Sequence, residues 1–119
     1  MHQPQSLNVR VKTFTLTRSD STSTKRCSLP DGAIILDILE TTSVLSAGAQ
    51  LDVGDSSNDD RFVAALDVAT AQKNVATLLD TYTALSGMTD VYAHIQGAPG
   101  AGGPYRVSIL YTDPAWTRR

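Results

Sequence analysis

Leu29-Pro-Asp-Gly-Ala-Ile-Ile-Leu-Asp-Ile-Leu-Glu-Thr-Thr-Ser-Val44 is the stretch around which the rest of the chain is organised. It begins with a turn signal, because Pro30 fixes φ for an early turn position and Gly32 accepts a positive φ. The densest apolar run of the chain, residues 33–39, follows at once. A small-residue link at 46–48 then leads to residues 49–53, where apolar and polar side chains alternate. This order predicts two successive strands.

Residues 33–44 could form either a helix or a strand, because Ile34, Ile35, Ile38 and Leu39 also fit one helical face. The isoleucines and the threonines that follow favour a strand, since β-branched side chains suit a pleated surface. In a regular strand, Ile35 and Leu39 lie on the face opposite Ile34, Leu36 and Ile38. A second apolar face needs a cover, and a neighbouring subunit is one candidate. We therefore predict that Ile35 and Leu39 belong to an interface between chains.

Further candidate strands occur along the chain at roughly 8–15-residue spacing. They are residues 7–16, 25–29, 62–70, 91–96 and 105–111. Within the first, Phe14 and Leu16 take the opposite parity to Val9 and Val11, which predicts a bulge. The last two are expected to form an antiparallel hairpin around the Gly/Pro loop 97–104. About eight short strands predict an all-β fold, a single antiparallel β-sandwich or jelly-roll.

A helix within 62–86 is the main alternative to this all-β interpretation. Its apolar residues match helical spacing: Val75, Leu78, Leu79, Tyr82 and Leu85. Interspersed threonines and the lack of a clear cap count against a helix, so we predict a strand at 75–79.

The totals describe one domain of modest charge. A chain of 119 residues fits a single β-sandwich domain over 1–119, with an N-terminal arm at 1–6 and a C-terminal tail at 113–119. The net charge of -2 does not favour a nucleic-acid partner, and no apolar run is long enough for a membrane span. Residues 1–6 lack the pattern of a signal peptide, so we expect synthesis in the reducing cytoplasm.

We expect no enzyme activity, no cofactor and no metal, because no group of residues has the required spacing. His94 and Cys27 are too isolated to predict a nucleophile–base pair or a metal site. Loop 97–104 has glycines but neither the lysine nor the following helix of a phosphate loop. Loop 54–60 offers Asp and Asn oxygens of the kind that calcium takes, but a solvated loop is the favoured interpretation.

The C-terminal tail joins the predicted interface. Trp116, Arg118 and Arg119 are of the residue types that anchor interfaces between proteins. We predict that they contact a partner, with a frayed tail as the equally plausible alternative.

The order of segments resembles a known class of virion protein. The residues that carry the resemblance are Leu29-Pro-Asp-Gly-Ala-Ile-Ile-Leu-Asp-Ile, then Gln50-Leu-Asp-Val-Gly-Asp and an Asp-rich loop, and lastly Gly103-Pro-Tyr-Arg-Val-Ser-Ile-Leu-Tyr. This order is similar to that of small tailed-bacteriophage decoration (cement) proteins. The resemblance implies a non-enzymatic homotrimer, made in the host cytoplasm, that binds the major capsid protein on the outer capsid surface and stabilises the coat lattice.

A phage tail- or fibre-associated module, or a host-glycan-binding β module, is the alternative function. Such a module would use exposed aromatic side chains beside Asp and Asn residues in loops. The candidates are Tyr82, Tyr92, Tyr105 and the loop at 55–60. The aromatic content of 6% counts mildly against this alternative.

Overall fold

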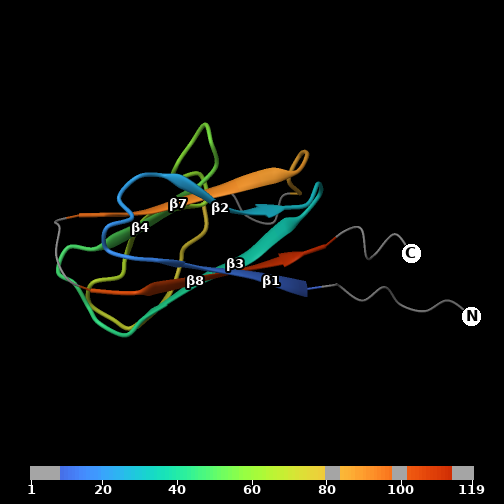
Figure 1. The fold of residues 1–119 in the computed structure, drawn as a ribbon. Coiled ribbons are helices and arrows are strands. Elements are labelled where there is room, and N and C mark those ends of the chain that lie inside the picture. The colour runs from blue at the N-terminus through green and yellow to red at the C-terminus, as the bar shows by residue number, and fades with distance from the viewer. Residues whose placement is uncertain (1–8, 80–83, 98–101, 114–119) are drawn as a thin grey trace, which may run out of the picture.

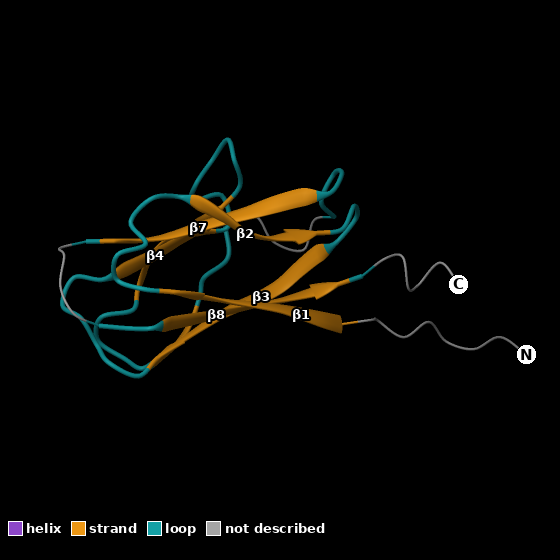
Figure 2. Cartoon of the chain, viewed as in Figure 1, coloured by secondary structure: helices purple, strands orange, loops and turns teal. Residues whose placement is uncertain are grey.

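The computed structural model describes residues 9–79, 84–97 and 102–113, and within them the chain is an antiparallel β-sandwich (Figures 1 and 2). These residues form eight strands and no helix. The strands are β1 (Val9–Leu16), β2 (Thr24–Leu29), β3 (Ile34–Thr42), β4 (Gln50–Gly54), β5 (Val63–Asp67), β6 (Lys73–Val75), β7 (Thr89–Gln96) and β8 (Tyr105–Thr112). The predicted all-β sandwich is confirmed.

Two four-stranded sheets face one another, in the orders β1-β8-β3-β6 and β2-β7-β4-β5. Among the strands of the described residues, only β4 and β5 are both consecutive in sequence and paired, because every other connection crosses from one sheet to the other. The expected hairpin of residues 91–96 with 105–111 is therefore wrong: β7 pairs with β2 and β4, and β8 pairs with β1 and β3.

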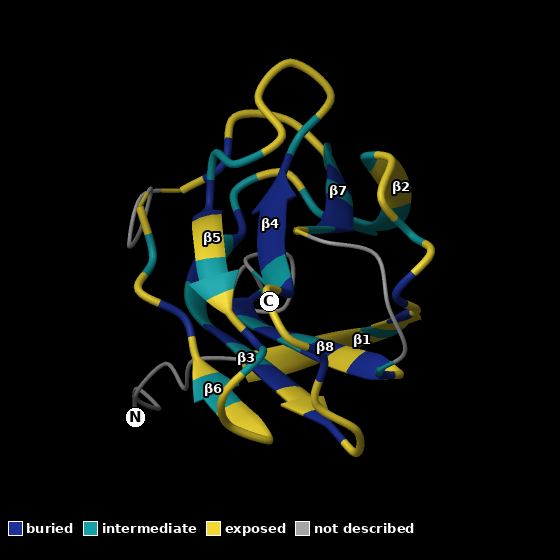
Figure 3. Cartoon of the chain, turned by 90° about the vertical axis from the view of Figure 1, so that its left-hand side faces the viewer, coloured by how far each residue is buried: buried dark blue, intermediate teal, exposed yellow. Residues whose placement is uncertain are grey.

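The core fills the space between the sheets, where Figure 3 shows the buried segments of the facing strands. Alternate residues of each strand point inward, as the period of a strand requires. The core residues include Leu16, Leu29, Ile38, Leu51, Val53, Val91, Ile95, Tyr105, Val107 and Ile109. Full burial of each large apolar side chain contributes roughly 1.5–3 kcal/mol, so this layer is the main source of stability.

A bulge in β3 changes which side chains of residues 34–39 face the core, so the predicted assignment of faces is wrong. The pairing with β8 shifts between Ile35 and Asp37, so one extra residue, Leu36, is inserted. Ile35 and Ile38 therefore both face the core, at 2% and 0% exposure, instead of lying on opposite faces. Leu39 stays on the outer face, opposite Ser108 of β8.

No bulge is present in β1, contrary to expectation. Its register with β8 is continuous from Val9 to Leu16, and the change of parity has another cause. Phe14 and Leu16 pair with the core-facing Val107 and Tyr105, whereas Val9 and Val11 lie on the outer face and are exposed. Apolar side chains thus occupy both faces of one regular strand.

The remaining expectations have mixed outcomes. Ala33 N donates to Pro30 O at 3.1 Å and Gly32 has a φ of 83°, which confirms the turn before β3. The strand predicted at 75–79 is wrong in its bounds, because β6 ends at Val75. Within 62–86 the described residues contain no helix, and 80–83 lie outside them.

Candidate interaction surface

The outer face of the β1-β8-β3-β6 sheet carries a set of unburied apolar side chains. Residues directly opposite in an antiparallel pair lie on the same face, so the register places them in rows across the strands. One row is Val9, Thr112 and Ile34, the next is Val11, Leu110 and Asp37, and the third is Thr13, Ser108, Leu39 and Val75. We call Val9, Val11, Ile34, Leu39, Val75 and Leu110 the outer apolar surface.

Exposure on this surface is high for apolar side chains. Val9, Val11 and Val75 are 50%, 57% and 66% exposed, and Ile34, Leu39 and Leu110 are half-buried. The row beyond Leu39 is polar, with Thr15, Arg106, Thr41 and Lys73. The face is therefore divided into an apolar end, where β1 begins and β8 ends, and a polar end.

The predicted interface residues are only partly brought together. Leu39 lies in the outer apolar surface, whereas Ile35 is buried in the core of this chain. Trp116, Arg118 and Arg119 lie outside the described residues. The sequence did not point to Val11, Leu110 or Val75 as surface residues. For Val11, the regular alternation of apolar and polar side chains along β1 was the available signal.

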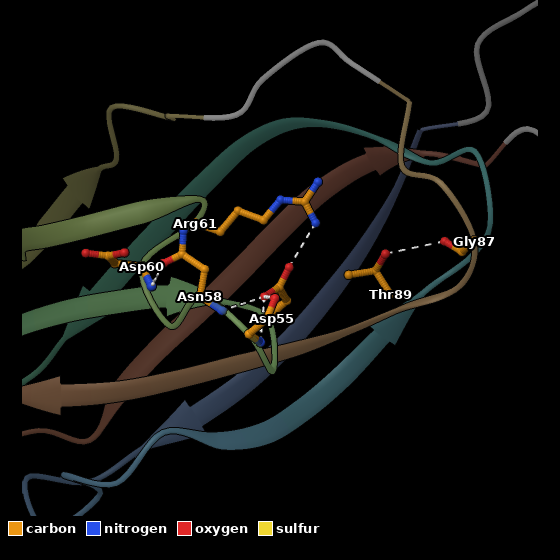
Figure 4. Close-up of polar contacts among 7 residues, drawn as sticks. Asp55, Asn58, Asp60, Arg61, Gly87 and Thr89 are labelled. Atoms are coloured by element: carbon orange, nitrogen blue, oxygen red, sulfur yellow. Dashed lines mark hydrogen bonds and ion pairs between the residues drawn. The ribbon is translucent and has the colours of Figure 1, made fainter.

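The acidic loop between β4 and β5 is organised by one carboxylate (Figure 4). Asp55 Oδ1 accepts hydrogen bonds from Asn58 N at 2.8 Å, Ser57 N at 2.9 Å and Ser57 Oγ at 3.0 Å, and Asp55 Oδ2 lies 3.0 Å from Arg61 Nη1. Partial burial raises the pKa of Asp55, but these hydrogen bonds outweigh it and hold the pKa below its usual range. The Asp55 carboxylate thus makes these hydrogen bonds within its own loop. No group of three metal-binding side chains exists among the described residues.

Of the glycan-binding candidates in the described part of the chain, Tyr92 and the loop at 55–60 lie together at a surface cavity. The cavity, of about 430 Å³, is lined by Tyr92 together with Ser23 and residues 55–59. Tyr105 is fully buried in the core, and Tyr82 lies outside the described residues.

His94 has a structural partner that the sequence did not reveal. Its Nε2 lies 3.2 Å from Asp52 Oδ2, and Asp52 also accepts from Gln96 Nε2 at 2.8 Å and from Ala65 N at 2.7 Å. The side chains of His94 and Asp52 are both buried. These contacts join β7 to β4 through the His94 ring, while its Nδ1 is buried without a hydrogen-bond partner among the described residues.

The described residues contain no helix with the length and apolar character needed to cross a membrane. No protein-family model matches the sequence, and no curated protein matches it.

Several solved structures are similar to this chain. A chain of the cyanophage Pam1 capsid asymmetric unit aligns with a TM-score of 0.68 and 28% identity, over 94% of this chain and 89% of that one. A chain of the acidic stable capsid of Helicobacter pylori bacteriophage KHP30 has a TM-score of 0.67 and 15% identity, over 90% and 89%. A chain of the capsid of Ralstonia phage GP4 has a TM-score of 0.59 and 18% identity, over 93% and 88%. The chain therefore has the fold of proteins found in bacteriophage capsids, and the likeness supports a structural role in a virion.

Proposed function

We propose that this chain is a capsid decoration (cement) protein, without enzyme activity, that binds the outer capsid surface. The observation that carries the proposal is the near-complete alignment, at 28% identity, with a chain of the Pam1 capsid. The strand order β1-β8-β3-β6 over β2-β7-β4-β5 gives it further support, because two four-stranded sheets joined by repeated crossings are typical of a jelly-roll.

The outer apolar surface is the proposed contact of this protein with its neighbours. An apolar sheet face left in water is unfavourable, and burial against another chain removes that cost. We infer that the neighbours are two further copies in a homotrimer and the major capsid protein beneath it. Many such contacts around a shell act together through multivalency, so each can be modest and still stabilise the lattice.

The area of the outer face of β1, β3 and β8 indicates that residues outside this face also contribute to the proposed interface. Three strands of about eight residues span roughly 26 Å by 14 Å, a flat footprint near 360 Å². A standard stable interface buries about 800 Å² on each partner. β8 ends at the apolar end of the face, and residues 114–119 come shortly after it in the sequence, so Trp116, Arg118 and Arg119 are the proposed additional contacts.

Binding to assembled particles is the direct test. The purified protein is mixed with capsids of the encoding phage that lack it, and bound protein is measured by co-sedimentation. We expect saturable binding and a higher temperature of capsid opening. A protein that never co-sediments, or that binds without changing that temperature, contradicts a cement role.

A matched pair of variants tests the surface itself. Val11→Asp places a charge in the outer apolar surface, and Met88→Asp places one on a loop side chain that is 74% exposed. Light scattering on a size-exclusion column should give a trimer for the wild type and Met88→Asp, and a smaller species for Val11→Asp. An unchanged trimer in Val11→Asp would remove this face from the proposal.

Host-glycan binding remains a second candidate function because Tyr92 lines a cavity with Asp and Asn side chains. A ring beside hydrogen-bonding groups can pack against the apolar face of a sugar. A glycan-binding protein should bind a sugar array without capsids and lose that signal in Tyr92→Ala. A cement protein should ignore the array.

A further inference from the structure

Arg18 is a buried cation with no anionic partner in the described part of the chain. It lies just after β1, is 8% exposed, and donates from Nε to Ser46 Oγ at 2.9 Å. Its Nη2 is buried and has no hydrogen-bond partner among the described residues. An arginine cannot escape this cost by losing its proton, because its pKa lies far above neutral pH.

Neither Asp20 nor Glu40, two carboxylates of the described part of the chain, forms an ion pair with Arg18. Asp20, two residues along, accepts from Thr17 N at 2.6 Å and lies 3.6 Å from Arg26 Nη2. Glu40 Oε1 accepts from Asn74 Nδ2 at 2.8 Å, and Glu40 Oε2 is buried with no hydrogen-bond partner among the described residues, Arg18 included. Since an uncompensated buried charge costs several kcal/mol, the geometry calls for an anion from outside the fold.

A second buried donor lies at the same place. Tyr105 Oη has no hydrogen-bond partner among the described residues, and the side chain is fully buried. Gly102 lies beside both Tyr105 and Ser46. A Cβ at Gly102 would lie 3.0 Å from Tyr105 Oη and 2.3 Å from Ser46 Cβ, so these two side chains are close to one another. The Arg18 guanidinium contacts Ser46, and Ser46 and Tyr105 Oη both lie beside Gly102, so the three groups lie near one another at the end of the sandwich where β1 ends and β8 begins.

We propose that Arg18, Ser46 and Tyr105 form a binding site for a small oxyanion, a phosphate or a carboxylate. The open hydrogen-bonding capacity at the site consists of guanidinium N–H and tyrosine O–H groups, and an oxyanion supplies acceptors for both. The anion is either free in solution or the carboxylate of a neighbouring protein chain. This site is separate from the outer apolar surface, so it does not depend on the proposed function.

Thermal unfolding of the full chain tests the site. The wild type is titrated with sodium phosphate, and separately with sodium acetate, against sodium chloride at the same ionic strength. We expect at least one of the two anions to raise Tm saturably, by about 5 °C at ten times its Kd. In Arg18→Met that rise should vanish, while Tm in chloride should be equal to or above that of the wild type because the unpaired buried charge is gone.

Matched variants separate the site from general salt effects. Arg106→Gln removes an exposed arginine at the same end of the β1-β8-β3-β6 sheet and should keep the full anion response. Tyr105→Phe keeps the ring and should weaken anion affinity several-fold, which preserves the test if Arg18→Met does not fold. If the anion comes from a neighbouring chain, Arg18→Met should also lower the mass of the assembled species in chloride, and free phosphate should compete with assembly. Equal responses in all variants, with no change in mass, would overturn the proposal.

Discussion

His94 Nε2 lies 3.2 Å from Asp52 Oδ2 across the pairing of β4 with β7, and both side chains are buried. The same carboxylate accepts from the backbone of Ala65, which has a positive φ of 54°. A non-glycine residue in that conformation is strained, so the hydrogen bond to Asp52 helps to hold β5 in place. Asp52 thus connects three strands through one carboxylate.

Removal of this carboxylate should destabilise the fold strongly. We expect Asp52→Ala to lower the free energy of unfolding by about 3 kcal/mol, because Ala65 N and the side chains of His94 and Gln96 lose their acceptor. Urea denaturation measures the loss, and Asp59→Ala, at an exposed position of the β4–β5 loop, is the control. A loss below 0.5 kcal/mol, the range of ordinary surface changes, would show that the contact is incidental.

Asp20 should contribute to stability in a pH-dependent way. The hydrogen bond from Thr17 N, 2.6 Å long, is the largest cause of a pKa lowered below the ordinary value of about 3.9, and the charge of Arg26 adds to it. A carboxyl with a depressed folded-state pKa stabilises fully above its unfolded pKa and loses that contribution as the pH falls through the folded value.

The variant Asp20→Asn should therefore reduce the loss of stability below about pH 3.9. Urea midpoints measured between pH 7 and pH 2 for the wild type and Asp20→Asn test this. Parallel pH curves for the two proteins would contradict the assignment, and the exposed Asp59→Asn serves as the reference for a charge change alone.

The strands could be predicted from sequence better than their neighbours and faces. Alternation correctly located β7 and β8, but not that they belong to different sheets, because pairing depends on connections that cross the sandwich. The faces of β3 could not be assigned, since apolar residues occupy both parities around Leu36 and hide the bulge. Of the outer apolar surface, Leu39 was predicted from the sequence. Val75 and Leu110 could not be assigned to this surface without knowing which strands pair.

Glu40 should destabilise the protein as the pH rises. It is 1% exposed, its Oε2 has no hydrogen-bond partner among the described residues, and burial raises its pKa above the ordinary value of about 4.3. A raised folded-state pKa gives a contribution that is full below the unfolded pKa and is lost as the pH rises through the folded value.

Glu40→Gln should accordingly be more stable than the wild type at pH 8, by about 1 kcal/mol, with the difference shrinking towards pH 4. The amide oxygen can still accept from Asn74, so the hydrogen bond at Oε1 is kept. Urea denaturation at pH 4, 6 and 8 checks the trend. A constant difference across these pH values would mean that the carboxyl does not titrate as its burial requires.

Two glycines with positive φ should respond differently to the same substitution. Gly97 has a φ of 109°, and a Cβ there would lie 1.8 Å from the carbonyl oxygen of Gly48, whereas Gly87 has a φ of 80° and open space around it. Gly87→Ala should cost about 1 kcal/mol for backbone conformation alone. Gly97→Ala should cost about 3 kcal/mol or more, because the backbone of the β3–β4 connection cannot rotate away as a side chain can. Chemical denaturation of both variants decides the matter: equal losses would mean that the 46–49 segment moves aside, and that the close approach of residues 48 and 97 does not help to hold the end of the sandwich.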